Sequence, residues 1–435
     1  MRHLSRRGLL KGAGAVAGVS ALAACGGVAG GGSGRSGGGL RYAFWGNNVR
    51  QTNYQKAFDL MAEQNEELTL KVEFAEYSAF QERMTTQMAA GNVADIFWVP
   101  SPQVMTYYSN GLYRPLESVE SLDLSDYSDA DIQDFLLDGE HNTMPFGIFV
   151  PVVRFNATFV EEDGVDWPEA WDWDGFAEFA KGYSAETEDR WAVAYAADAD
   201  LCFEGWLRQH GEELWTEDGR IGYTQEGLES WIAWWEDLRE AGATPSIGEQ
   251  DGVGASWEDV GDRCLAWFSN SNHIVDDSTM FPDFDFALSH LPVDPSAPDG
   301  HQFLYFPRQA IYAEASDANA ELAGEVFNFT TGDVEMLKTV GLTMGAPVNP
   351  RVAEEYAEFA SPVETAMLEV VSEDREADRT PRFEAPPGSS TWRDVMTRAL
   401  ENVTNGNSTI PEASAAMIEE ISTGIERAAG GEGQG

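Results

Sequence analysis

The sequence predicts an α/β fold in two lobes, and three observations support this prediction. The folded part begins with apolar strands that alternate with amphipathic helices, and a β-α-β-α-β order requires a parallel sheet with right-handed crossovers. Residues 94–99 form an almost wholly apolar run, as expected of a parallel strand buried on both faces. The chain has 435 residues with 43% hydrophobic content, which is enough for two domain-sized units.

The first third of the chain supplies these alternating elements. In the first strand, Leu40, Tyr42 and Phe44 share one face. Ser78 is expected to cap the second helix, which ends at Gly91. Because ligand sites open at the carboxyl ends of parallel strands, the end of the third strand is a candidate position for a site. The elements expected here are strands over 40–45, 68–74 and 94–99 and helices over 50–65 and 78–91.

The later elements are less regular. Trp231, Trp234 and Trp235 have helical spacing and are expected in a core rather than on a ligand platform. Residues 117–143 are acidic and irregular. The further elements expected are a strand over 191–195, a helix end followed by a strand within 262–272, and helices over 168–179, 228–241, 320–329, 334–340, from 391 onward, and 411–428.

The charge balance excludes one class of partner and suggests an environment. The chain has 27 Lys and Arg against 74 Asp and Glu, so its net charge is −47. Nucleic acid is excluded because its phosphates would repel such a surface. An acidic, lysine-poor surface spread over the whole length is typical of adaptation to molar salt, where the screening length falls to about 3 Å. The alternative is that the acidic surface serves solubility alone.

The amino-terminal residues 1–24 are interpreted as a targeting segment. Residues 5–11 contain Arg6 and Arg7 and resemble a twin-arginine export signal, and residues 22–25 match a lipobox that ends in Cys25. Such a match implies cleavage before Cys25 and a lipid on its sulfur. Residues 25–39 are then the lipidated Cys and a flexible Gly/Ser tether. The apolar run is too short and too rich in glycine for a stable membrane span.

A resemblance to a known family rests on residues 89–96, Ala-Ala-Gly-Asn-Val-Ala-Asp-Ile. They resemble the AAG-x-x-PD-(I/V) region of the extracellular solute-binding proteins of ABC importers, the family that includes maltose- and glycerol-phosphate-binding proteins. Ala94 stands where the family usually has proline. Residues 144–156 resemble the segment that crosses from the first lobe to the second, and residues 345–350 resemble the family's G-x-x-P stretch.

The resemblance implies the type II periplasmic-binding-protein fold, in which two doubly wound α/β lobes are joined by a hinge. Crossovers are expected near residues 147–151 and 306–311. The implied boundaries are 40–149 with 309–343 for lobe 1 and 150–308 with 344–435 for lobe 2. The resemblance also implies a binding protein that is not an enzyme, lies on the extracellular face of the membrane as a lipid-anchored monomer, and docks on ABC permease subunits. A haloarchaeal source fits the charge.

The candidate ligand residues are aromatic or amide-bearing side chains expected at strand ends. A sugar ring offers flat C–H faces and a rim of hydroxyls, which suit aromatic plates and convergent polar groups. Trp98 and Trp392 are the leading candidates, because the resemblance aligns them with stacking positions. Asn47 and Glu76 would bind hydroxyls. The full set is Trp45, Asn47, Glu76, Tyr77, Trp98, Ser101, Phe149, Asp200, Trp206, Asn270, Tyr305 and Trp392.

Other functions remain open at this point. An anionic solute such as a glycerol phosphodiester would need Arg308 or Arg393 as its partner, and an oligopeptide or a polyamine is a further possibility. A secreted glycoside hydrolase would need a pair of carboxylates at fixed separation. The six His residues show no metal-ligand spacing, so neither a metal nor another cofactor is expected. Cys202 and Cys264 could form a disulfide or remain two buried thiols.

Overall fold

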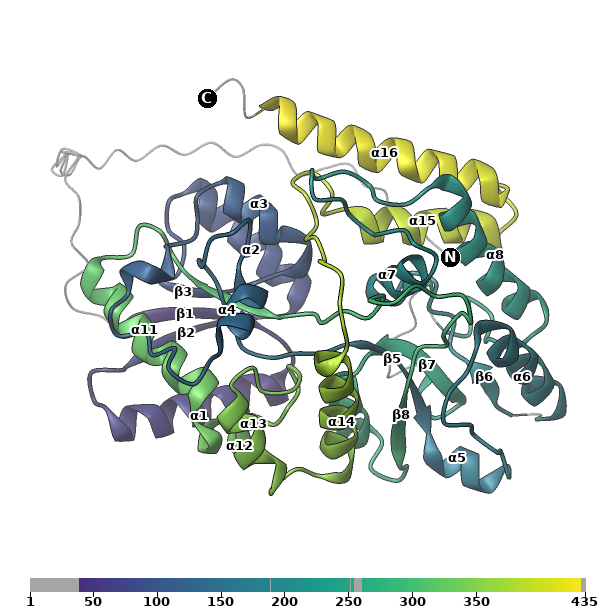
Figure 1. The fold of residues 1–435 in the computed structure, drawn as a ribbon, viewed down its shortest axis with the longest axis horizontal. Coiled ribbons are helices and arrows are strands. Elements are labelled where there is room, and N and C mark those ends of the chain that lie inside the picture. The colour runs from purple at the N-terminus through teal and green to yellow at the C-terminus, as the bar shows by residue number, and fades with distance from the viewer. Residues whose placement is uncertain (1–38, 188, 251, 254–259, 432–435) are drawn as a thin grey trace, which may run out of the picture. The chain divides into compact units, whose positions relative to one another are not determined.

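The computed structural model describes residues 39–187, 189–250, 252–253 and 260–431. The predicted signal peptide, Cys25 and nearly all of the tether lie outside these residues. Residues 38–435 form one compact unit. Within it the described strands form two sheets, each covered by its own helices (Figure 1). The predicted α/β class is therefore confirmed.

The first sheet belongs to what we call lobe 1. Its strand order is β2-β1-β3-β9-β4. β1 pairs in parallel with both β2 and β3, which confirms the predicted β-α-β-α-β start, whereas β9 runs antiparallel to β3 and β4. The strands are β1 (Leu40–Trp45), β2 (Leu70–Ala75), β3 (Ile96–Val99), β4 (Met144–Pro145) and β9 (Arg308–Ile311). The helices are α1 (Asn48–Gln64), α2 (Tyr77–Ala89), α3 (Val104–Ser109), α4 (Asp129–Phe135), α11 (Asp317–Gly332), α12 (Val334–Val340) and α13 (Pro350–Ala357).

The second sheet belongs to what we call lobe 2. Its order is β6-β7-β5-β8, in which β5 runs antiparallel to both β7 and β8. The strands are β5 (Pro151–Asn156), β6 (Trp191–Val193), β7 (Cys264–Asn270) and β8 (Phe286–His290). The helices are α5 (Ala157–Glu162), α6 (Trp173–Glu186), α7 (Asp200–Gln209), α8 (Gln225–Glu240), α10 (His273–Met280), α14 (Pro362–Glu376), α15 (Trp392–Thr404) and α16 (Ile410–Gly431).

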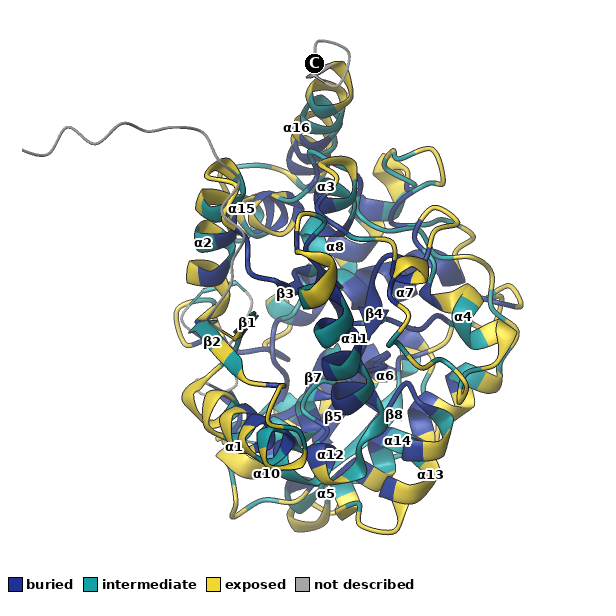
Figure 2. Cartoon of the chain, turned by 90° about the vertical axis from the view of Figure 1, so that its left-hand side faces the viewer, coloured by how far each residue is buried: buried dark blue, intermediate teal, exposed yellow. Residues whose placement is uncertain are grey.

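Burial explains why these segments form these elements. Figure 2 shows buried strands enclosed by helices whose outer faces are exposed. All four residues of β3 are buried, as the apolar run predicted. Trp231 and Trp235 of α8 are fully buried in the lobe 2 core, and Trp234 is partly buried against it, so the prediction that this tryptophan cluster belongs to a core is confirmed.

Two details differ from the sequence-based expectations. α2 begins at Tyr77, and its N-cap is Glu76, which makes no side-chain capping hydrogen bond, so Ser78 lies inside the helix instead of capping it. α13 packs against α11 and α12 of lobe 1, although residues from 344 onward were predicted to belong to lobe 2. α14 then packs against α10 and β8 of lobe 2.

Candidate ligand-binding site

The chain segments that connect the two lobes are joined to one another. Phe149 lies between β4 and β5, and Tyr305 lies between β8 and β9. Their backbones exchange two hydrogen bonds, with N···O distances of 3.1 and 2.9 Å, and their rings stack with centroids 4.8 Å apart. Ile148 exchanges a similar pair of backbone bonds with Ala346. The connecting segments therefore form a common floor on which aromatic side chains are placed.

Side chains from both lobes meet above this floor. Tyr77 begins α2, directly after the carboxyl end of β2, and it is 38% exposed. Its pKa is raised by desolvation and by the negative charge of Asp200, while the positive charge of Arg393 opposes the shift. Asp200 begins α7 and Arg393 lies in the first turn of α15, both in lobe 2. Tyr77 of lobe 1 therefore lies close to an acidic and a basic group of lobe 2.

Arg393 is oriented by a buried carboxylate. Its Nε and Nη2 atoms donate to the same oxygen of Asp198, at 3.2 and 3.1 Å. Asp198 is 3% exposed, whereas the Arg393 side chain is 62% exposed. Desolvation opposes the charge of Arg393, but Asp198 and Asp200 together raise its pKa. The guanidinium group is therefore held as a fixed, charged donor at the open surface of lobe 2.

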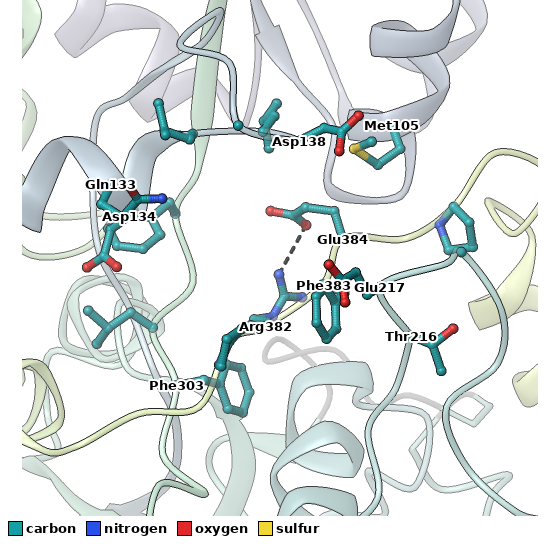
Figure 3. Close-up of a pocket in the computed structure, with 18 of the residues that line it drawn as sticks. Met105, Gln133, Asp134, Asp138, Thr216, Glu217, Phe303, Arg382, Phe383 and Glu384 are labelled. Carbon is teal, nitrogen blue, oxygen red and sulfur yellow. Dashed lines mark hydrogen bonds and ion pairs between the residues drawn. The ribbon is translucent and has the colours of Figure 1, made fainter.

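A cavity of about 630 Å³ lies beside the floor, because Leu304 and Phe306, which flank Tyr305 in the sequence, line it. Figure 3 shows this cavity. Its walls come from α3 and the α4 turn of lobe 1, from the 216–219 loop of lobe 2, and from segments 303–308 and 379–387. Three guanidinium groups and four carboxylates line it, namely Arg308, Arg379, Arg382, Asp134, Asp138, Glu217 and Glu384. Each of these arginines pairs with a carboxylate, so the positive charges are neutralised within the protein.

Six of the predicted ligand residues lie near one another, five at the floor and its lobe 1 edge and one in lobe 2. Trp45 contacts the edge of the Tyr77 ring, with centroids 5.4 Å apart. The Ser101 side chain interacts with the Tyr305 hydroxyl and lowers its pKa, against the larger effect of desolvation. The residues that the structure brings together are Trp45, Tyr77, Ser101, Phe149 and Tyr305, with Asp200 facing them from lobe 2.

Trp98 does not occupy the position that the stacking prediction requires. Its side chain has no exposed surface. The ring stacks on Phe146 with centroids 4.6 Å apart, and Nε1 donates to the Tyr42 hydroxyl at 2.8 Å. Because β3 is buried on both faces, a large side chain at its end packs into the lobe 1 core. In this structure Trp98 is a core residue and offers no face to a ligand.

Trp392 and Trp206 are likewise core residues of lobe 2. Trp392 is 5% exposed, stacks on Phe203, and donates from Nε1 to the Tyr223 hydroxyl at 2.9 Å. Trp206 is also buried, and its ring stacks on His210 with centroids 4.6 Å apart. The exposed side chain at the head of α15 is that of Arg393, the next residue along the helix.

The remaining predicted residues have local roles or open positions. Asn47 caps α1, because its side-chain oxygen accepts from the Arg50 amide at 2.9 Å. Glu76 is exposed just before Tyr77. Asn270 ends β7 opposite Pro151 and is partly buried. These three positions lie at element ends, as predicted, but the structure does not bring their side chains into the group that contains Tyr77.

Both cysteines of the described chain are buried free thiols. Cys202 lies in α7 and Cys264 begins β7. Burial raises the pKa of each thiol well above its usual value, which makes both groups poor nucleophiles. Of the two alternatives that the sequence left open, the structure contains the pair of thiols and not the disulfide.

Sequence reasoning missed a histidine beside the site. His273 begins α10, directly after β7, and its Nδ1 lies 3.0 Å from the Ser269 hydroxyl. Burial lowers the pKa of His273 to about 3, assisted by the positive charges of Arg154, Arg50 and Arg393. Arg50 belongs to lobe 1 and Arg393 to lobe 2, so His273 lies where the lobes meet. The sequence signal that could have indicated His273 is its position shortly after the end of a strand.

Comparison with known proteins identifies the family. Residues 55–366, more than two-thirds of the chain, match the family described as bacterial extracellular solute-binding protein. The chain belongs to this family. It is accordingly a solute-binding protein of the extracellular type, and its two α/β lobes form the periplasmic-binding-protein fold that the sequence resemblance implied.

Three solved structures show the same fold in other solute-binding proteins. A family 1 extracellular solute-binding protein from Alicyclobacillus acidocaldarius is 20% identical, with a TM-score of 0.66, and the match covers 88% of this chain and 97% of that one. A periplasmic oligogalacturonide-binding protein from Yersinia enterocolitica, in complex with saturated digalacturonic acid, is 18% identical, with a TM-score of 0.76 and coverage of 90% and 99%. The GacH receptor of Streptomyces glaucescens, studied unliganded and with acarbose, is 15% identical, with a TM-score of 0.70 and coverage of 89% and 99%.

Among the residues that the structure describes, no helix is both long enough and apolar enough to span a membrane. Within the same residues, no group of three or more His, Cys, Asp or Glu side chains is arranged to hold a metal ion.

Proposed function

We propose that this solute-binding protein is the substrate-binding component of an ABC importer, and that it holds a sugar between its two lobes and delivers it unchanged to the permease. The observation that carries the proposal is that the charges of Asp200 and Arg393 of lobe 2 act on Tyr77 of lobe 1, which in turn acts on Tyr305 of the stacked pair. A ligand held there would touch both lobes. Its contacts would therefore favour the closed arrangement of the lobes over an open one.

The chemistry of these side chains favours a sugar. Aromatic faces suit the C–H faces of a pyranose ring. A fixed guanidinium can donate to one hydroxyl while the carboxylate beside it accepts from the next. The oligogalacturonide-binding protein and the acarbose-bound receptor share this fold, and both were solved with saccharide ligands. Those ligands support the carbohydrate class for this chain without identifying its sugar.

An uncharged sugar fits better than an anionic solute. The arginines considered for anion binding are already paired, Arg393 with Asp198 at 3.1 Å and Arg308 with Glu384 at 3.6 Å. A glycerol phosphodiester would have to compete with these carboxylates. It would also approach the additional negative charge of Asp200.

The proposal also covers how the protein is exported and where it works. The twin-arginine pattern and the lipobox support export and a lipid on Cys25, which would tether a monomeric protein to the outer face of the membrane. The net charge of −47 supports a salt-rich environment. A lipid anchor with a flexible tether would keep the binding lobes close to the permease.

The test is ligand binding by the purified full-length protein in 2 M KCl. A thermal-shift screen of neutral sugars, uronates and glycerol phosphodiesters should show a raised melting temperature with neutral sugars, because ligand binding stabilises the native state. Calorimetry should then give one-to-one binding, weakened at least tenfold by Tyr77→Ala and by Asp200→Asn. Asp317→Asn is the matched control, since Asp317 is exposed on α11. Product formation from the sugar, or stabilisation by phosphodiesters alone, would overturn the proposal.

A further inference from the structure

Four side chains of alternating charge are linked in a row at the 630 Å³ cavity. Glu204 of α7, which is 1% exposed, accepts from the Nη2 of Arg382 at 3.1 Å. The Nη1 of Arg382 donates to Glu384 at 3.0 Å, and the other oxygen of Glu384 lies 3.6 Å from the Nε of Arg308. Figure 3 shows Arg382 and Glu384 linked near the middle of the open space. Arg382 therefore has a carboxylate on each side, and Glu384 has a guanidinium on each side.

Aromatic rings stand beside this pair. The guanidinium carbon of Arg382 lies 5.7 Å from the ring centre of Phe303 and 5.1 Å from that of Tyr305. Tyr305 is also the ring that stacks on Phe149 at the floor of the interlobe site. Leu304 and Phe306, the neighbours of Tyr305 in the sequence, line the cavity, as Arg382 does. Tyr305 therefore links the cavity wall to the floor of the interlobe site.

The cavity is suited to hydroxyl groups. A carboxylate has about four lone-pair positions, so Glu384 can accept further hydrogen bonds beyond the one that Arg382 donates. A volume of about 630 Å³ lies within the range of small-molecule sites. The excess of carboxylates over guanidinium groups on the walls disfavours an anionic occupant. An uncharged polyhydroxyl group fits these conditions.

We propose that this cavity is a second compartment of the ligand site, which takes the sugar units that extend beyond Tyr305, and that Glu384 recognises their hydroxyl groups. The substrate would then be an uncharged oligosaccharide rather than a monosaccharide. Arg382 acts as a positioning residue, because it donates to one oxygen of Glu384 while Arg308 lies near the other oxygen. This inference rests on the proposed function, because it assigns an extension of the same site.

The experiment measures affinity against chain length in the full-length protein. Neutral gluco-, manno-, xylo- and arabino-oligosaccharides of one to five units are titrated by calorimetry in 2 M KCl. In the series that binds, affinity should rise at least tenfold from the monosaccharide to the longer chains. Glu384→Gln, which keeps the shape and removes the charge, should abolish most of this gain.

A second variant keeps the test valid if Glu384→Gln folds poorly. Met105→Trp on α3 fills the cavity without touching the ion pairs and should also remove the gain from chain length. Glu373→Gln, in an exposed position on α14, is the control and should behave as wild type. If monosaccharides bind as tightly as longer chains, or if both cavity variants keep the gain, this inference fails while the proposed function stands. If no neutral sugar of any series binds, both fail.

Discussion

Phe149 and Tyr305 are joined both by stacked rings and by two backbone hydrogen bonds. They lie on the first two connections between the lobes, so this pair ties the outgoing and the returning chain at one point. Both side chains are less than 10% exposed. A relative movement of the lobes must therefore either bend the chain on both sides of this pair or break the stack.

The first prediction concerns the stacked pair. Phe149→Ala removes a buried ring and should lower the free energy of unfolding by about 3 kcal/mol. It should also weaken sugar binding, because Tyr305 loses the ring that supports it. Urea titration and calorimetry measure the two effects. Phe149→Leu, which retains most of the volume, should lose less in both measurements, and equal losses for Leu and Ala would contradict a role for the ring.

The sequence predicted the fold well because its signals are local. The alternation at Leu40, Tyr42 and Phe44 and the apolar run after Asp95 report burial directly, and the parallel pairing of β1 with β2 and β3 follows from their order. Family resemblance then supplied the two-lobed arrangement. Helix boundaries were harder to predict. Ser78 was expected to cap the second helix, but α2 begins at Tyr77 and its N-cap is Glu76.

The site was harder to predict, because it is assembled from segments far apart in sequence. A tryptophan at a strand end can face the ligand or the core. Trp98 faces the core, where its Nε1 donates to the Tyr42 hydroxyl and its ring stacks on Phe146. Arg382 and Glu384 lie in an irregular segment without periodicity. Their meeting with Glu204 of α7 depends on the tertiary fold.

The second prediction separates core from ligand roles for the tryptophans. Trp98→Phe should lower the free energy of unfolding by about 1 to 2 kcal/mol, since it removes ring volume and a buried hydrogen bond. Trp392→Phe should do the same through the loss of the bond to Tyr223. Sugar affinity of the folded variants should remain within twofold of wild type. A tenfold loss of sugar affinity with an unchanged free energy of unfolding would show instead that these tryptophans stack on the ligand.

The third prediction concerns the thiols. Without any reductant, the unfolded protein should be alkylated at both Cys202 and Cys264, and mass spectrometry should show two added groups on the corresponding peptides. In the folded protein both thiols should react slowly, because burial keeps them protonated and inaccessible. Alkylation that appears only after reduction would demonstrate a disulfide and contradict the structure.

The fourth prediction concerns salt. With a net charge of −47, self-repulsion destabilises the compact state in dilute buffer and is screened over about 3 Å at 1 M salt. The melting temperature should therefore rise steadily from 0.1 to 2 M KCl. NaCl at the same ionic strength should give a similar rise if screening is the cause. A melting temperature that is highest in dilute buffer would exclude the proposed adaptation to salt.

The fifth prediction follows from the lowered pKa of His273. The unfolded chain takes up a proton at this residue near pH 6.5, whereas the folded protein resists it down to about pH 3, because burial and the charges of Arg154, Arg50 and Arg393 oppose a further positive charge. The stability linked to His273 is therefore present above pH 6.5 and is lost as the pH falls toward 3.

His273→Gln removes this linkage and retains a polar side chain of similar length. Since each pKa unit corresponds to about 1.4 kcal/mol, wild type should lose about 3 kcal/mol more than the variant between pH 6.5 and pH 4. Urea titrations at several pH values in constant 2 M KCl measure the difference, and the carboxylates that titrate in this range contribute equally to both proteins. Parallel pH profiles would mean that His273 is protonated in the folded state, so that it could not lie among the three arginines as the structure places it.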